Sequence, residues 1–215
     1  MTWSNRLGSN GFEMGYAIVT DQQNHVVCGG LFQNEITMDS QDGNFQKFTS
    51  NGSFDYFVAK YDQQGNLIWG DAQGASGIEG ILDLATNSHG SVYAAGYYLD
   101  PETQIEDTTF TCVDGNEALL IKYDRDGNYQ WAKTTSTSNH SGYLYALGVT
   151  AKDSILMLGH YQGEGTFLDG ITYSNHNSDK DLWISLLRDT EKTETEDTTT
   201  TGLREMQAST VKLYP

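Results

Sequence analysis

The chain has 215 residues, of which 23 are glycine, 13 are tyrosine and only 2 are proline. Its 29 acidic against 12 basic residues give a formal net charge of −17, which repels the phosphates of nucleic acids and anionic membrane surfaces. We therefore expect no nucleic-acid partner, and no window reaches the roughly 18 apolar residues of a membrane-spanning helix. Many tyrosines among frequent glycines favour a β protein, and the length suits one domain with a tail.

The first eleven residues, MTWSNRLGSNG, lack the apolar core of a secretory signal peptide. We interpret Met1 as an expression start that replaced an export signal. The segment TWSNRLG contains the first of three tryptophans that recur along the chain, and its meaning depends on the repeats that follow it.

Three landmarks recur together at spacings of 62 to 66 residues. The first is a strand that ends in glycine and an aromatic residue, in HVVCGGLF (25–32), SVYAAGYY (91–98) and SILMLGHY (154–161). The second is an acidic residue that opens an apolar strand, in DYFVAKYD from Asp55, EALLIKYD from Glu117 and DLWISLLR from Asp181. The third is a tryptophan, at Trp3, Trp69 and Trp131. Landmarks that share one spacing indicate three structural repeats.

Each repeat contains four short segments that have strand character and are separated by turn residues. In the second repeat the expected strands are 81–86, 91–98, 117–124 and 128–133. The turn YDQQGN between the last two strands of the first repeat is explained by Asp62, which accepts a backbone hydrogen bond, and by Gly65, which supplies a positive φ. The third strands are almost continuously apolar, which predicts that both faces of each sheet are covered.

Sheets of four antiparallel strands repeated every 60 residues or so describe the blades of a β-propeller. We therefore expect an all-β, β-propeller-like fold of three four-stranded antiparallel blades in residues 1–188, with units at about 3–68, 69–130 and 131–188. The motifs GNLIW and DYFVAKYD, with the glycine-containing strand, resemble the β-propeller repeats of large exported proteins from Bacteroidota and are similar to the seven-bladed β-propeller type repeat. The resemblance covers residues 3 to about 188. It weakens in the third unit, where Leu186-Leu187-Arg188 replace Lys-Tyr-Asp and no GNxxW follows.

The two ends of the repeat region complement each other. The chain begins with a lone fourth strand, TWSNRLG, and its last unit ends at the third strand, DLWISLL. Propellers usually have four to eight blades, so three blades predict either a piece of a longer propeller or a homodimer that completes a six-bladed ring. A three-bladed structure that closes on itself is the remaining alternative.

The composition changes after residue 188. Residues 189–208 are rich in threonine and glutamate and predict a disordered linker. Residues 209–215 resemble the truncated start of the C-terminal sorting domain of the type IX secretion system, on the basis of Val211, Leu213, Tyr214 and Pro215. This resemblance implies a protein that is secreted or held at the cell surface.

The sequence contains no motif of a hydrolase, no phosphate-binding loop and no ligand spacing for a metal. We expect no catalytic residue, no metal and no cofactor. Cys28 and Cys112 are predicted to be free thiols, because two cysteines are too few for a disulfide framework.

Aromatic residues at the ends of the second strands are the candidate ligand-binding residues: Tyr97, Tyr98, His160 and Tyr161. Tyrosine rings stack well on sugars, because they combine an apolar face with a polar tip. The alternative is that these side chains pack between the blades. The connections 33–54, 99–116 and 162–180 are further places for recognition, since loops on a rigid scaffold often carry function.

These observations favour a non-catalytic, exported or cell-surface β-propeller module that binds a protein or a glycan, or that displays loops. The alternative is a propeller enzyme that hydrolyses or cleaves polysaccharide, with Asp83, Asp153 or Glu164 as participating acids. An enzyme requires such groups to converge in one concave site. A third interpretation is a structural spacer in a large surface protein.

Overall fold

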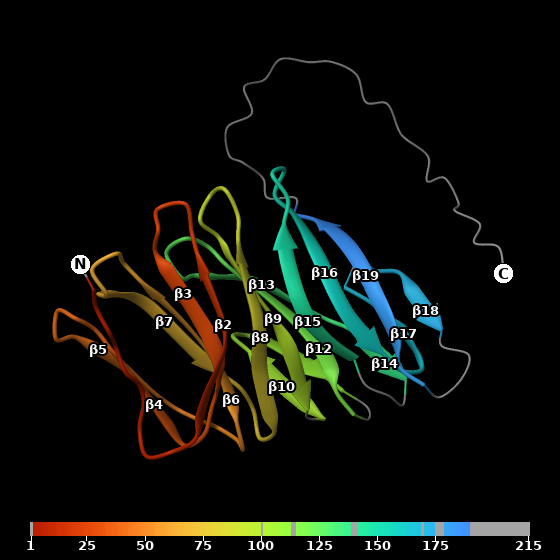
Figure 1. The fold of residues 1–215 in the computed structure, drawn as a ribbon. Helices are drawn as coiled ribbons and strands as arrows, with labels where there is room; N and C mark the ends of the chain where they lie inside the picture. Colours follow the sequence, from red (N-terminus) through yellow and green to blue (C-terminus); the bar gives the residue numbers. More distant parts are fainter. Residues whose placement is uncertain are drawn as a thin grey trace.

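The computed structural model describes residues 2–99, 101–112, 115–138, 142–168, 170–174 and 179–189. In these residues all regular structure is β-strand, and every paired strand within a sheet is antiparallel. The strands form sheets that follow one another along the chain from the N-terminal to the C-terminal end of the molecule (Figure 1). The all-β, propeller-like fold class is confirmed.

The blades correspond to three sheets with the same strand order. The first sheet contains β2 (Glu13–Thr20), β3 (Val26–Phe32), β6 (Asp55–Tyr61) and β7 (Leu67–Gln73). The second contains β8 (Ile78–Thr86), β9 (Val92–Leu99), β12 (Glu117–Tyr123) and β13 (Tyr129–Thr134). The third contains β15 (Gly142–Val149), β16 (Ser154–Tyr161) and β19 (Asp181–Arg188). Within the described residues this last sheet has three strands, which agrees with the missing GNxxW motif.

The long connections between second and third strands form hairpins of their own, which the sequence analysis treated as loops. The first connection contains β4 (Glu35–Asp39) and β5 (Phe45–Thr49), with the short N-terminal strand β1 (Leu7–Gly8) paired to β4. The second contains β10 (Glu102–Ile105) and β11 (Thr108–Thr111). In the third, β17 (Glu164–Thr166) and β18 (Thr172–Ser174) pair with each other, and β14 (Ser136–Ser138) pairs with β17. The predicted linker and sorting segment lie outside the described residues, apart from Asp189.

The apolar third strands lie between neighbouring sheets. All seven residues of β6 and all seven of β12 are buried, so the predicted cover on both faces is present. Tyr56 and Val58 of the first blade share a core with Ile81 and Leu84 of the second. Each blade therefore stabilises its neighbour by removing apolar side chains from water.

The turn after the third strand has the predicted conformation in the first and second blades. Gly65 and Gly127 have φ values of 86° and 90°, which favour glycine. The carboxylate of Asp62 accepts hydrogen bonds from the backbone N–H groups of Gln64 and Asn66, both at 2.8 Å. The repeated YDxxGN sequence is thus explained by a hairpin turn.

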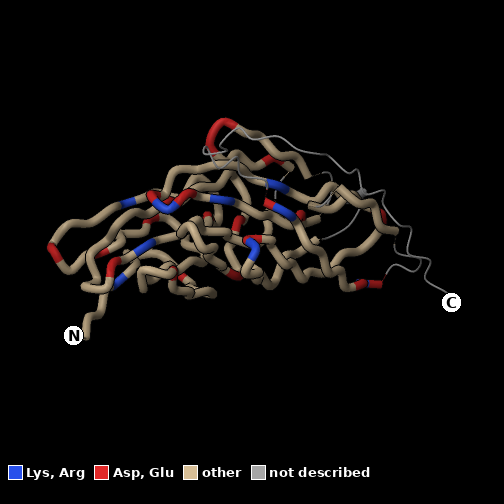
Figure 2. Tube along the Cα trace, turned by 90° about the horizontal axis from the view of Figure 1, so that it is seen from above, with Lys and Arg blue, Asp and Glu red and all other residues tan. Residues whose placement is uncertain are grey.

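Among the described residues, the positions of Lys and Arg and those of Asp and Glu are spread along the arched array, and no run of basic positions forms a stripe (Figure 2). The described residues contain no helix of sufficient length and apolarity to cross a membrane.

Both cysteines are free thiols, as predicted, and Cys28 provides a test of the packing. Burial raises the pKa of Cys28 to about 11, which leaves about one thiolate per thousand molecules at pH 8. We expect Ellman's reagent to react with the native protein at pH 8 at least about 100-fold more slowly than with the chain unfolded in guanidinium. Equal rates in the two states would contradict this packing, in which Cys28 is partly buried and Cys112 is buried.

Candidate ligand-binding face

The structure separates the four predicted ligand-binding residues into two pairs. Tyr98 and Tyr161 are buried, at 0% and 6% exposure, and pack in the cores between blades. Tyr97 and His160, each one position earlier in its strand, point the other way because successive side chains of a strand alternate between faces. The two rings of this second pair both contact Tyr143 of the neighbouring strand β15.

Tyr143 joins Tyr97 to His160. Its ring centroid lies 4.7 Å from that of Tyr97 and 5.1 Å from that of His160. Tyr145 adds a second tyrosine, with its ring parallel to that of Tyr143 within 3° at 5.5 Å, and with His160 at 5.3 Å. We call Tyr97, Tyr143, Tyr145 and His160 the tyrosine cluster.

Local backbone features place these rings. Tyr143 stands directly opposite His160 in the β15–β16 ladder, so their side chains are cross-strand neighbours. Tyr145 occupies the bulge of β15 between Leu144 and Ala146, which turns its ring outward. Tyr97 lies across the strand from Gly80, where a Cβ atom would come within 3.3 Å of the tyrosine ring.

The tyrosine cluster is uncharged at neutral pH. Burial raises the pKa of Tyr97, and the nearby hydroxyls of Tyr143 and Tyr16 act in the same direction. Burial also lowers the pKa of His160, with a further contribution from the positive charge of Lys180. His160 is only 7% exposed, and its Nε2 has no hydrogen-bond partner among the described residues.

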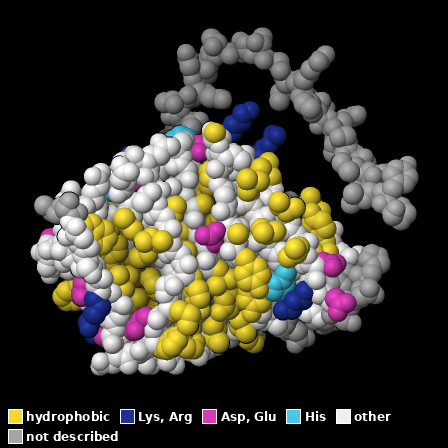
Figure 3. Space-filling model, viewed as in Figure 1, with side chains coloured by type: hydrophobic (Ala, Val, Ile, Leu, Met, Phe, Trp, Pro, Cys, Tyr) yellow, Lys and Arg dark blue, Asp and Glu magenta, His cyan; other side chains and the backbone are white. Residues whose placement is uncertain are grey.

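Part of the tyrosine cluster is open to solvent. Tyr145 is 47% exposed, and Tyr16, at the equivalent bulge of β2, is 46% exposed. Figure 3 shows that hydrophobic side chains gather on the face over β2, β8 and β15, the first strands of the three blades. Tyr16 belongs to β2 and Tyr145 to β15. Such a face can stack on a planar or apolar ligand, while the hydroxyls supply hydrogen bonds.

The sequence analysis named Tyr97 and His160 but did not consider Tyr16, Tyr143 and Tyr145, because it examined only the ends of second strands. The signal for Tyr143 was its place in GYLY, at the start of the strand before SILMLGHY. The bulges that expose Tyr16 and Tyr145 leave no mark in the sequence beyond the repeat itself.

The three acids considered for an enzyme do not meet. The carboxylate of Asp83 accepts a hydrogen bond from the backbone N–H of Leu147 at 2.7 Å and thereby joins the second blade to the third. Asp153 accepts from the N–H and hydroxyl of Ser88, at 3.0 and 2.8 Å, and its pKa is lowered, the backbone hydrogen bond being the largest cause. Glu164 lies at the opposite end of β16 from Asp153. In the described part of the chain, no three His, Cys, Asp or Glu side chains gather to hold a metal ion.

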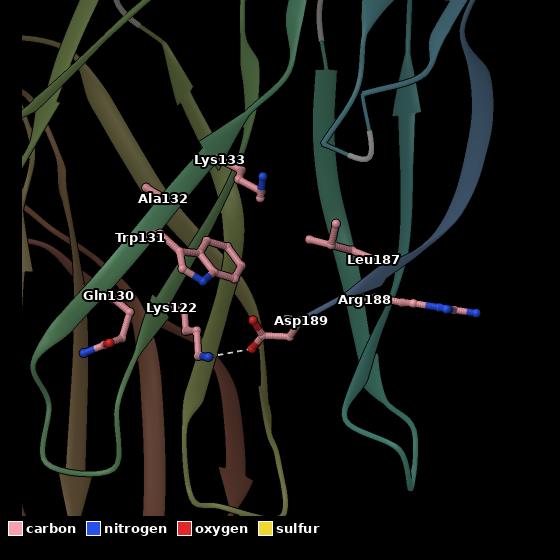
Figure 4. Close-up of a pocket in the computed structure, with 8 residues that line it drawn as sticks. All are labelled: Lys122, Gln130, Trp131, Ala132, Lys133, Leu187, Arg188 and Asp189. Atoms are coloured by element: carbon pink, nitrogen blue, oxygen red, sulfur yellow. Dashed lines mark hydrogen bonds and ion pairs between the residues drawn. The ribbon is translucent and has the colours of Figure 1, made fainter. Parts of the chain in front are cut away.

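A concave region lies where the third blade ends. Figure 4 shows Trp131 and Lys122 on one side and Leu187 and Asp189 on the other, with Lys122 bound to the carboxylate of Asp189. Lys122 is fully buried and Asp189 is nearly so, which makes this pair part of the packing between the second and third blades.

These features define a β-propeller-like repeat protein with stacked antiparallel blades. No protein-family profile matches the sequence. The chain is similar to the uncharacterized WD repeat-containing protein L264 of Acanthamoeba polyphaga mimivirus, with 21% identity over 187 residues. The match covers 75% of this chain but only 13% of that relative, so the chain spans a small part of the relative's length.

Proposed function

We propose that the protein is a non-catalytic binding module that holds its ligand on the tyrosine cluster and the adjacent Tyr16. The observation that carries the proposal is the convergence of aromatic rings from the first and second strands of neighbouring blades. A rigid stack of sheets presents these rings with little freedom to lose on binding. Partly exposed tyrosines on such a scaffold are typical of binding hot spots.

A protein segment is the ligand class that this face favours. Tyr145 and Tyr143 offer parallel rings beside the neutral His160, a surface suited to an apolar or aromatic side chain of a partner. The similarity to a WD repeat-containing protein supports the same choice. A glycan that stacks on the rings is the alternative ligand, and the experiment below separates the two.

The cellular location in this proposal is outside the cytoplasm, either secreted or at the cell surface. Its support is the resemblance of the repeats to exported Bacteroidota proteins and of residues 209–215 to a sorting domain. The test is to label intact cells that carry the full-length gene with a membrane-impermeant biotin reagent. Labelling only after lysis would contradict this location.

Replacing Tyr145 with alanine should abolish most of the binding without unfolding the protein, because this side chain is 47% exposed. The folded protein is first screened against a displayed peptide library and a glycan array. We expect the best binder to lose about 2 kcal/mol, roughly a 30-fold increase in Kd measured by calorimetry.

The matched control is Phe45→Ala, which removes an aromatic ring that is 64% exposed on β5, away from the tyrosine cluster. A binder weakened by Phe45→Ala and not by Tyr145→Ala would place the site elsewhere. Absence of binders in both screens would favour the structural spacer.

A further inference from the structure

The N-terminal segment lies against the first blade as though it were the outer strand of a preceding blade. Trp3 covers Gly65, whose added Cβ would come within 2.7 Å of the indole, and its Nε1 donates to the carbonyl of Gln63 at 3.2 Å. A Cβ atom added at Gly127 would likewise lie 2.6 Å from the indole of Trp69 on β7, and the Nε1 of Trp69 donates to the carbonyl of Arg125 at 3.3 Å. The two tryptophans therefore make the same contact with the blade that follows.

One edge of this segment is already paired. The carbonyl of Arg6 accepts a hydrogen bond from the N–H of Asp39, and Leu7 and Gly8 stand opposite Met38 and Thr37 of β4. Because the backbone groups of a strand alternate in direction, those of Asn5 and Leu7 point to the other edge. In the first and second blades the equivalent edge of the fourth strand, β7 or β13, pairs with the third strand of the same sheet, β6 or β12.

Among the described residues, no fourth strand lies at the opposite end of the array, where the N-terminal segment of another blade would fit. In the described residues β19 pairs with β16 alone, so its outer edge has no strand. On the face that would meet a next blade, β19 exposes Leu182 (76%), Ile184 (74%) and Leu186 (49%). The equivalent residues of β6, which are Tyr56, Val58 and Lys60, are at most 2% exposed because the second blade covers them.

The first blade has the complementary open face. Ile18 of β2 is 75% exposed, whereas its equivalent in the second blade, Leu84, is 5% exposed because the first blade covers it. The exposed face of β19 and the exposed face of β2 thus correspond to the two surfaces that pack together wherever one blade of this chain meets the next. Large apolar side chains exposed in this way mark an interaction surface.

We propose that residues Trp3–Leu7 of a second copy of this chain pair with the free edge of β19. The first blade of that copy then covers Leu182, Ile184 and Leu186, and the same contact at the other end closes two copies into a ring of six blades. The junctions inside the chain fix the register. Since Val58 pairs with Asp71, two residues beyond Trp69, Ile184 should stand opposite Asn5, two residues beyond Trp3.

Light scattering of the full 215-residue protein at 1 to 100 μM tests the association. We expect a mass of twice 23.8 kDa for the native chain. Ile184→Lys should give a monomer over the whole range, because the lysine would be buried at the contact while remaining exposed in the free chain. The control Phe45→Lys, on β5, should remain a dimer.

A disulfide tests the register. The double variant Asn5→Cys with Ile184→Cys should form a covalent dimer under oxidation, seen on a non-reducing gel. Asn5→Cys with Ser185→Cys should not, because a shift of one residue directs the thiol to the opposite face of the sheet. A native monomer, a dimer unaffected by Ile184→Lys, or masses that grow beyond the dimer would each overturn the closed six-bladed ring.

Discussion

Replacing Asp21 with alanine should lower the free energy of unfolding by about 3–5 kcal/mol, measured by urea denaturation at pH 7. Asp21 lies in the turn between β2 and β3, and its side chain is fully buried beside the equally buried ammonium group of Lys60, 3.0 Å away. The same carboxylate accepts from the backbone N–H groups of Gln23 and His25, both at 2.9 Å. Removal of this carboxylate would leave a buried positive charge without its ion-pair partner.

The matched control for this variant is Asp62→Ala. Asp62 makes the corresponding turn contacts, with the N–H groups of Gln64 and Asn66, but has no lysine beside it. We expect Asp62→Ala to cost about 1 kcal/mol. Equal losses for the two variants would show that the buried pair contributes nothing beyond the turn.

The pH dependence provides a second test of Asp21. Burial alone would raise the pKa of this carboxyl group, but the hydrogen bonds from Lys60 and from the N–H of His25 outweigh it, so the pKa is lowered. A lowered folded-state pKa contributes stability above the unfolded value of about 4, and that stability is lost as the pH falls through the folded value. We therefore expect the free energy of unfolding of the native protein to fall as the pH is lowered below about 4. Asp21→Asn, which has no carboxyl group to protonate, should not show this part of the loss.

The sequence predicted the parts of the fold that recur. The YDxxGN turn, the acidic residue that opens each third strand and the spaced tryptophans all occupy equivalent places in the structure, because each satisfies a local or nearest-neighbour requirement. The inserted hairpins were not predicted, since a connection such as 33–54 has no counterpart of the same sequence in the other blades. Their threonine and phenylalanine residues were the signal that strands form there.

The sequence analysis named only some residues of the proposed site, for a physical reason. The sequence places Tyr97 and Tyr98 side by side, and only the register of the sheet decides which of them faces the core. Tyr143 reaches His160 through a cross-strand pair, and Tyr145 is exposed by a bulge. Neither the pairing register nor the bulge can be inferred from the spacing of residues along one chain. The ion pair of Lys60 is equally hard to infer, because Lys60 lies on β6 and its partner Asp21 lies 39 residues earlier, in the turn between β2 and β3.

Gly96→Ala should lower the free energy of unfolding by about 3 kcal/mol, by overpacking against rigid backbone. A Cβ atom added at Gly96 would lie 1.8 Å from the carbonyl oxygen of Gly80 on the neighbouring strand β8. The same contact recurs at Gly30, where the Cβ would lie 1.9 Å from the carbonyl of Met14. The loss is measured by urea denaturation with a probe of the whole fold, such as tryptophan fluorescence.

Gly15→Ala is the matched control, because Gly15 also lies in a strand and next to a bulge, yet an added Cβ would meet nothing within 4 Å. This control should be neutral or more stable by about 0.4–1 kcal/mol, since alanine restricts the unfolded chain. Equal midpoints for Gly96→Ala and Gly15→Ala would mean that the strands separate without cost. If the two variants differ as expected, the recurring glycine of each second strand marks the place where the bulge of the first strand approaches it. That bulge is also what turns Tyr145 outward, so one backbone feature explains both a repeat signature and the exposure of the proposed binding face.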